Sequence, residues 1–154
     1  MKIDNSLERN PSETTSQFLE RLKDAGYIFH GSNNSNITVL EPRPTFDPTS
    51  SENTDTAVFA TDDIVWATIF GVWGGHTGWK TSSNGSGKVL ATIKAVEKRN
   101  VEKSTGCIYV LSKESFGEPN QGRQFKSHAK VNPLTKITVN LQDYYDLGGE
   151  VKWS

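Results

Sequence analysis

Three residues suited to ligand chemistry, His30, Gly31 and Ser32, follow the apolar run 27–29. An imidazole can accept, donate or transfer a proton near neutral pH, a glycine lets a ligand approach the backbone, and a serine adds a hydroxyl. The asparagines at 33 and 34 also fit an ordinary strand that ends in a turn. A lone histidine at a strand end more often forms a structural hydrogen bond than a catalytic site. The choice between these interpretations therefore depends on motifs elsewhere in the chain.

The remaining histidines and the cysteine do not predict another kind of site. His76 and His128 lack the spacing of paired metal ligands, and Cys107 is the only cysteine. Cys107 stands in the apolar run 107–111, where a small buried side chain is the expected role, and one cysteine forms no internal disulfide. The chain has no GxSxG, Walker A or GxGxxG motif. We therefore expect no metal site.

Length and charge predict one soluble domain. The chain has 154 residues and a formal charge of −1, which is enough for one core and gives no general nucleic-acid footprint. Residues 1–12 are polar and are expected to form a flexible N-terminal arm, with a single domain over 13–154. The chain shows neither an apolar signal segment nor a run of 18 apolar residues. A cytoplasmic protein without a membrane partner is the resulting expectation.

Local signals predict a helix and a strand in the first thirty residues. Thr14 and Gln17 form a capping-box pattern, an apolar stripe follows, and Gly26 is the expected stop. Residues 27–30 are the expected strand. The segments 33–56 and 74–87 are rich in small polar residues or glycine, so we expect exposed, mobile loops that cover a ligand or bind an acceptor.

The second half of the chain predicts one helix and then several strands. The segment "TAVFATDD" (56–63) is typical of a strand leading into a helix, with Thr61 as its N-cap and the aromatic-rich run 64–73 as its body. Stretches typical of strands follow at 88–96, 107–111, 123–131 and 136–141, with a short tail at 150–154. A helix and strands followed by a run of strands indicate an α+β fold.

The ordered set of these segments resembles the catalytic domain of the ADP-ribosyltransferases, closest to the diphtheria-toxin and poly(ADP-ribose) polymerase branch. The matching segments are "FHGS" (29–32), "AVFATDDIVWATIF" (57–70), "KVLATIKAVEK" (88–98) and "RQFKSHAKVNPLTKITVNL" (123–141). The resemblance implies a split α+β sandwich of two mostly antiparallel sheets with one or two flanking helices. It also implies NAD as a substrate and no metal.

The resemblance assigns roles to individual residues. Gly31 and Ser32 would hold the nicotinamide carboxamide, and His30 would hydrogen-bond a ribose hydroxyl. Phe70 is the first choice for the ring that stacks on nicotinamide, with Ile69 at the neighbouring register and Trp66 on the pocket wall. Phe59 and Thr61 complete the expected NAD-binding set. Core packing is the competing interpretation for Trp66 and Trp73, and a valine at position 31 is expected to block NAD without disturbing the fold.

One position departs from the family pattern. The family usually carries a glutamate at the start of a late strand, and the matching position here is Gln124. Glutamine can hydrogen-bond a ribose but has no charge to stabilise an oxocarbenium-like centre. We therefore take His30, Gln124 and Glu118 as the candidate catalytic residues, with Asp143 and Glu150 as other possible acids.

The resemblance then implies an enzyme, a glycosyltransferase acting on NAD. It would be a mono-ADP-ribosyltransferase or NAD glycohydrolase, since related enzymes with a substituted third residue still transfer single units. The acceptor stays open among protein, nucleic acid, small molecule and water. The alternative is a non-catalytic protein of the same fold that binds NAD, ADP-ribose or a nucleic-acid end. Transfer of a 2′-phosphate from RNA to NAD ranks last, because the chain has few arginines for a phosphate cluster.

Overall fold

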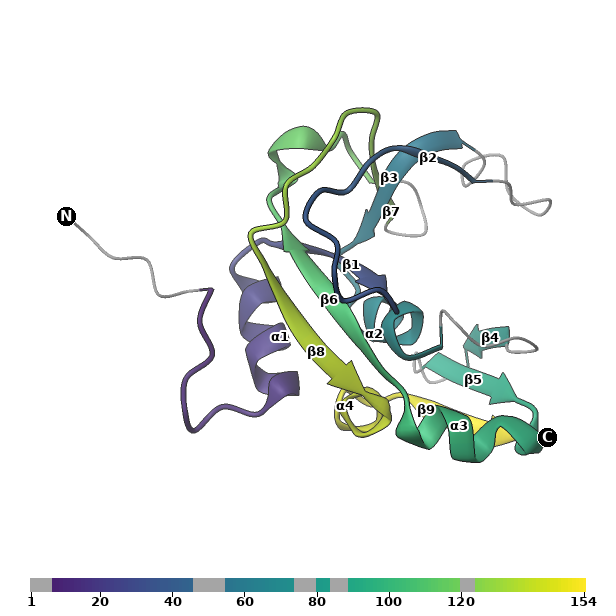
Figure 1. Ribbon diagram of the computed structural model, residues 1–154. Coiled ribbons are helices and arrows are strands. Elements are labelled where there is room, and N and C mark those ends of the chain that lie inside the picture. Colours follow the sequence, from purple (N-terminus) through teal and green to yellow (C-terminus); the bar gives the residue numbers. More distant parts are fainter. Residues whose placement is uncertain (1–6, 46–54, 74–79, 84–88, 120–123) are drawn as a thin grey trace.

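A computed structural model describes residues 7–45, 55–73, 80–83, 89–119 and 124–154 (Figure 1). The helices are α1 (Thr15–Asp24), α2 (Ile64–Trp73), α3 (Lys98–Lys103) and α4 (Leu141–Asp146). The strands are β1 (Ile28–Ser32), β2 (Arg43–Thr45), β3 (Asp55–Thr61), β4 (Lys80–Ser83), β5 (Val89–Ile93), β6 (Thr105–Leu111), β7 (Gln124–Ser127), β8 (Thr135–Asn140) and β9 (Glu150–Trp153). Short 3₁₀ helices cover Ala95–Glu97 and Lys113–Ser115.

The described strands form two sheets. The larger has six strands in the order β2-β3-β1-β6-β8, with β7 also paired to β3, and the smaller has the order β4-β5-β9. All pairings are antiparallel except that of β5 with β9. The predicted α+β class with two mostly antiparallel sheets is confirmed. The predicted one or two helices were wrong, because the described residues form four α-helices.

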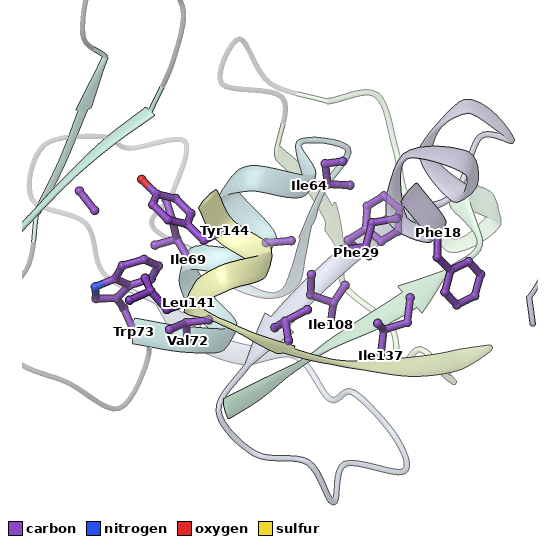
Figure 2. Close-up of a cluster of buried hydrophobic side chains, with 14 of the residues drawn as sticks. Phe18, Phe29, Ile64, Ile69, Val72, Trp73, Ile108, Ile137, Leu141 and Tyr144 are labelled. Carbon is purple, nitrogen blue, oxygen red and sulfur yellow. The ribbon is translucent and has the colours of Figure 1, made fainter. Parts of the chain in front are cut away.

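The main core lies around α2, between the two sheets (Figures 1 and 2). It joins side chains from α1, β1, β5, β6 and α4 to those of α2, among them Leu19, Phe29, Ile69, Ile93 and Tyr144. A second buried cluster covers the other face of the larger sheet and includes Ile28, Val58, Tyr109 and Phe125. Successive residues of a strand point to opposite faces, so Ile28 and Phe29 enter different clusters. The larger sheet is therefore covered on both faces.

Glycines allow α2 to lie very close to the larger sheet. A Cβ atom at Gly31 in β1 would overlap the carbonyl oxygen of Ala67, and one at Gly106 in β6 would overlap the carbonyl group of Gly71. Both contacts are with helix backbone, which cannot move aside as a side chain can. The expectation that valine at Gly31 leaves the fold intact was therefore wrong, because its side chain would push against α2.

Helix boundaries follow local capping chemistry. Thr14 caps α1 in a complete capping box with Gln17, and Gly26 follows the helix with φ 97°, so the predicted start and stop are confirmed. Asp63, and not Thr61, caps α2, because its Oδ1 accepts from the amides of Val65 at 3.0 Å and Trp66 at 3.3 Å. The Thr61 hydroxyl instead accepts from the Asp63 amide at 3.0 Å.

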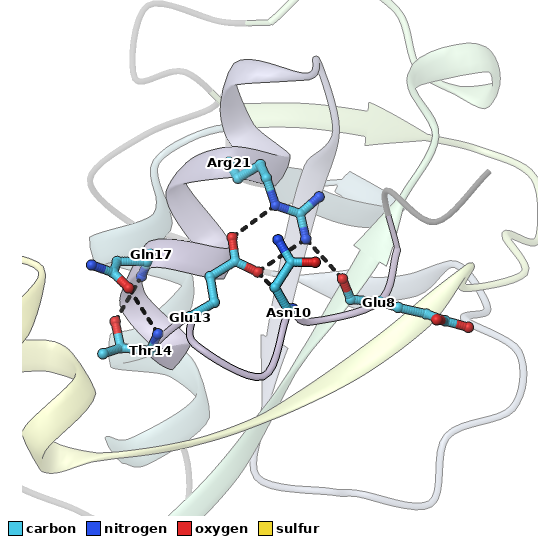
Figure 3. A network of polar contacts seen from close by, with 6 residues as sticks. All are labelled: Glu8, Asn10, Glu13, Thr14, Gln17 and Arg21. Atoms are coloured by element: carbon cyan, nitrogen blue, oxygen red, sulfur yellow. Dashed lines mark hydrogen bonds and ion pairs between the residues drawn. The ribbon is translucent and has the colours of Figure 1, made fainter.

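The N-terminal residues that the structure describes are tied to α1 (Figure 3). Arg21 donates from Nε to Glu13 Oε2 at 2.8 Å and from Nη2 to the Glu8 carbonyl at 2.8 Å. The Asn10 amide donates to Glu13 Oε1 at 3.0 Å, and Leu7 packs against the main core. The described part of residues 1–12 thus contacts the domain.

The predicted loops contain more regular structure than expected. The segment 33–56 includes β2 and a bridge between Leu40 and Val131, and the segment 74–87 includes β4. The strand expected at 123–131 is β7, which ends at Ser127. The predictions for 46–54, 74–79 and 84–87 fall outside the described residues. No helix in the described part of the chain has the length and apolar character needed to cross a membrane.

Candidate active site at the split between β1 and β3

Strands β1 and β3 separate at the His-Gly-Ser motif. β1 pairs with β6 along its whole length, whereas its described pairing with β3 is limited to Phe29↔Thr61. If the antiparallel register continued, Gly31 would lie opposite Phe59. That pairing is absent, and the contact between the strands here is made by a side chain: His30 Nδ1 lies 2.7 Å from the Phe59 carbonyl oxygen. An imidazole thus connects the strands where their ladder stops, and we call this gap between His30–Ser32 and Phe59 the split.

The Phe59 carbonyl determines the tautomer of His30. A carbonyl oxygen only accepts, so Nδ1 carries the hydrogen and donates it, and in the neutral ring Nε2 is left as an acceptor. Burial of the ring lowers the pKa of His30 below its usual 6.5; the Phe59 carbonyl opposes this shift, and the positive charge of Arg43 adds to it. The ring is therefore neutral at pH 7, with Nε2 suited to accept a hydrogen bond from a ligand hydroxyl.

This depressed pKa predicts a pH-dependent stability. The unfolded state binds a proton at His30 more readily than the folded state, so the free energy of unfolding should fall as the pH drops through about 6.5. His30→Asn keeps a donor for the Phe59 carbonyl but does not titrate, and it should reduce the slope between pH 7 and 5. Urea unfolding at several pH values measures this. His128→Gln removes an exposed histidine outside the split and is the matched control; an equal slope in wild type and His30→Asn would contradict the prediction.

Strand alternation turns the backbone of Gly31 toward the split. The Phe59 carbonyl faces β1, so the N–H and C=O of Thr61, two residues on, face β1 as well. Thr61 pairs with Phe29, and Gly31, two residues beyond Phe29, therefore presents its own N–H and C=O on the side of β3. The neighbouring strand β6 agrees with this. Val110, the partner of Phe29, directs its carbonyl away from β1 and toward β8, where it accepts from the Leu134 amide at 2.9 Å. An adjacent donor and acceptor of this kind match a primary carboxamide.

Thr61 and Gln124 lie side by side next to the split. β7 pairs with β3 at Thr61↔Gln124, so Phe29, Thr61 and Gln124 form one row across three strands. Phe59 is paired with Lys126 two residues along, and Lys126 Nζ lies 5.7 Å from the centre of the Phe59 ring. Directly paired residues share a face, which puts Gln124 on the face opposite to the His30 side chain. A ligand that contacts both would therefore have to reach from one face of the sheet to the other.

The aromatic residues of α2 divide into exposed and buried members. Phe70 is 40% exposed, and its ring centre lies 6.3 Å from that of the half-buried Trp66, one helical turn earlier. Ile69 and Trp73 are fully buried, and Trp73 packs edge-on against Tyr144 at 4.7 Å. Core packing is thus confirmed for Trp73. Trp66 and Phe70 directly precede Ala67 and Gly71, the two residues of α2 whose backbone atoms lie closest to Gly31.

The candidate acids lie elsewhere in the described structure. Glu118 is exposed in the irregular segment after the 3₁₀ helix Lys113–Ser115, and no described contact brings it to His30 or Gln124. Asp143 Oδ2 accepts from the Asn140 amide at 2.8 Å as part of the α4 cap, and burial raises the pKa of Asp143. Glu150 lies in β9 of the smaller sheet. Gln124 is the one candidate among these four residues that the strand register connects to the motif strand, through Thr61 and Phe29.

Sequence reasoning missed Arg43, whose charge acts on His30 from β2. The proline-rich segment around it is typical of a loop, so no local signal indicated the short strand Arg43–Thr45. Within the described residues, no group of three or more histidine, cysteine or acidic side chains is arranged to hold a metal ion.

Comparison with known proteins adds no relative to this description. No protein-family model matches the chain, and neither a curated protein nor a solved structure shows significant similarity to it.

Proposed function

We propose that the protein binds NAD in the split between β1 and β3 and cleaves the bond between nicotinamide and ribose. It would act as a mono-ADP-ribosyltransferase or an NAD glycohydrolase. The observation that carries this proposal is the meeting of three segments distant in sequence: His30 is bonded to the Phe59 carbonyl, and Thr61 is paired with Gln124 on the next strand. These are the segments in which the sequence resembles ADP-ribosyltransferases.

Each group at the split has a chemical use toward NAD. The N–H and C=O of Gly31 can bind the carboxamide of nicotinamide through two hydrogen bonds, which orients the leaving group. His30 Nε2 can accept from a ribose hydroxyl, since Nδ1 is already used by Phe59. The exposed face of Phe70, or of Trp66 beside it, can stack on the nicotinamide ring. Ser32, Phe59 and Thr61 complete the expected binding set.

The reaction asks the protein to stabilise positive charge on the ribose. As the glycosidic bond breaks, its electron pair leaves with nicotinamide, and the ribose carbon becomes oxocarbenium-like until an acceptor oxygen or nitrogen, or water, attacks it. Gln124 can hydrogen-bond the ribose but supplies no negative charge. Slow transfer of single ADP-ribose units is therefore the expected activity, with the acceptor identity open.

A binding protein without turnover is the second candidate, and Gln124 is the observation that favours it. A neutral amide stands opposite Thr61 where the family carries an acid, and Asp143 is engaged in capping α4. Such a protein would bind NAD, ADP-ribose or a nucleic-acid end.

Thermal unfolding tests the proposal. Millimolar NAD should raise the melting temperature, because a ligand at 100 times its Kd stabilises the folded state by about 2.7 kcal/mol. Phe70→Ala should shrink this shift, whereas Leu134→Ala should not, since Leu134 is similarly exposed at 45% but lies outside the split. No thermal shift and no calorimetric heat with NAD would contradict the proposal.

Release of nicotinamide separates the two candidates. Release in the presence of NAD, with or without an added protein or RNA acceptor, would support the enzyme. A thermal shift with NAD, ADP-ribose or a 5′-phosphorylated oligonucleotide but no release of nicotinamide would support the binding protein.

A further inference from the structure

A second row of paired residues starts at His30 and runs away from the split. His30 in β1 lies directly opposite Tyr109 in β6, and Tyr109 lies directly opposite Lys136 in β8. Directly paired residues share one face of a sheet. The three side chains therefore stand side by side on the face opposite α2, where Tyr109 is only 1% exposed.

This row holds the segment that follows the His-Gly-Ser motif. The Tyr109 hydroxyl donates to the Asn34 carbonyl at 2.6 Å and accepts from the Ile37 amide at 3.1 Å. The Lys136 ammonium donates to the carbonyl of Ser35, between these two. Residues 34–37 thus fold back across β6 and β8, and we call them the strap.

The strap is joined to the motif by its own hydrogen bonds. The Asn34 amide donates to Ser32 Oγ at 3.0 Å, and the Asn36 amide donates to Asn34 Oδ1 at 3.0 Å. The Tyr109 hydroxyl is therefore connected to Ser32 through a single residue, Asn34. Its ring is at the same time the cross-strand neighbour of the His30 imidazole.

We propose that Tyr109 is a positioning residue for NAD binding, which acts through Ser32 and His30 without touching the ligand. This inference rests on the proposed function. A buried hydroxyl that satisfies two main-chain groups of one turn fixes that turn before the ligand arrives. The entropy cost of ordering the strap is then met during folding, and binding is stronger because NAD does not have to order it. Removal of the hydroxyl should weaken binding and leave the chemical step nearly unchanged.

Tyr109→Phe tests this directly, because it removes one oxygen and keeps the ring beside His30. We expect the Kd for NAD to rise about tenfold, since the Asn34 carbonyl and the Ile37 amide lose their partner and the strap loosens. Nicotinamide release at saturating NAD should change less than about twofold, because the variant alters no group that the transition state contacts. Amide hydrogen exchange at 34–37 should become faster.

Tyr144→Phe is the matched control. Its hydroxyl is likewise bonded to two main-chain groups, the carbonyls of Glu150 at 2.7 Å and Val89 at 3.1 Å, but beside the smaller sheet. It should lose stability as Tyr109→Phe does and keep the wild-type Kd. Lys136→Met removes only the bond to Ser35 from an exposed side chain, and we expect it to raise the Kd about threefold.

The outcomes separate this inference from the proposed function. If wild type binds no NAD in calorimetry, both are overturned. If wild type binds NAD and Tyr109→Phe binds it equally well, or Tyr144→Phe weakens binding as much, only the role of Tyr109 is overturned. Should Tyr109→Phe fail to fold, an unchanged Kd in Lys136→Met overturns the inference, and a raised Kd supports it.

Discussion

Replacement of Gln124 by glutamate is expected to raise the rate of NAD hydrolysis about 100-fold. Gln124 lies opposite Thr61, which in turn lies opposite Phe29 of the motif strand, and glutamate has nearly the same size, so the fold should be kept. A carboxylate there would stabilise the oxocarbenium-like centre; preorganised charge of this kind is worth roughly 3 kcal/mol in the transition state, or about two orders of magnitude in rate. NAD affinity should change little, because the ground state gains less from this charge than the transition state does.

Nicotinamide release measured for wild type, Gln124→Glu and a charge control checks this expectation. Gln142→Glu is the matched control, since it makes the same change on α4, where Gln142 bonds to Asp146. It should leave the rate unaltered. If another acid already serves the reaction, Gln124→Glu should be neutral or harmful and Glu118→Gln should be the damaging change. Absence of turnover in all of these variants, with NAD binding retained, would leave the binding protein as the function.

Elements with purely local signals could be predicted from the sequence. The ends of α1 depend on Thr14, Gln17 and Gly26, all within or next to the helix, and they were predicted correctly. The six-residue helix α4 was missed, although Asn140 and Asp143 form a complete capping box. The alternating pattern of β8 continues into Leu141, so it is typical of a longer strand, and a helix this short has no apolar period of its own to oppose it.

The residue types of the site could be predicted, but their contacts could not. His30, Phe59 and Gln124 were singled out from motifs, yet the bond from His30 to the Phe59 carbonyl depends on where two strands separate, 29 positions apart in sequence. Arg43 of β2 acts on His30 through its charge, and Tyr109 of β6 lies opposite His30, but neither has a neighbour in sequence that reveals this. Such contacts depend on the register between strands that are far apart in sequence, and this register could not be inferred from the single sequence.

Gly31 shows how one residue type can fit two explanations. From the sequence, its lack of a Cβ is explained by the approach of a ligand, whereas the structure puts Ala67 of α2 at that position. The two explanations concern different sides of the same residue: the missing Cβ faces the helix, and the N–H and C=O lie along the sheet toward β3. A variant at Gly31 would disturb both, so the helix contact has to be tested at another glycine.

Gly106→Ala is that test, and we expect it to lower the free energy of unfolding by about 3 kcal/mol, the upper end of the usual cost of overpacking. The new methyl group would overlap the Gly71 carbonyl of α2. A Cβ atom at Gly71 would in turn lie 3.1 Å from Val139 Cγ2 and 3.3 Å from the Cys107 carbonyl oxygen. Helix and sheet therefore leave no room for a shift without a loss of packing elsewhere. The midpoint of urea unfolding measures the change.

Gly117→Ala is the matched control, because a Cβ there meets nothing within 4 Å, and its stability should stay within about 0.5 kcal/mol of wild type. Gly106 lies in β6, on the other side of β1 from the split, so its variant acts on the proposed NAD site only through α2. If α2 is pushed outward, Trp66 and Phe70 move relative to Gly31, and the thermal shift with NAD should shrink even where the protein still folds. An unfolding midpoint equal to that of Gly117→Ala would mean that the position of α2 does not depend on the glycine contacts. The glycine at position 31 would then be better explained by the approach of a ligand.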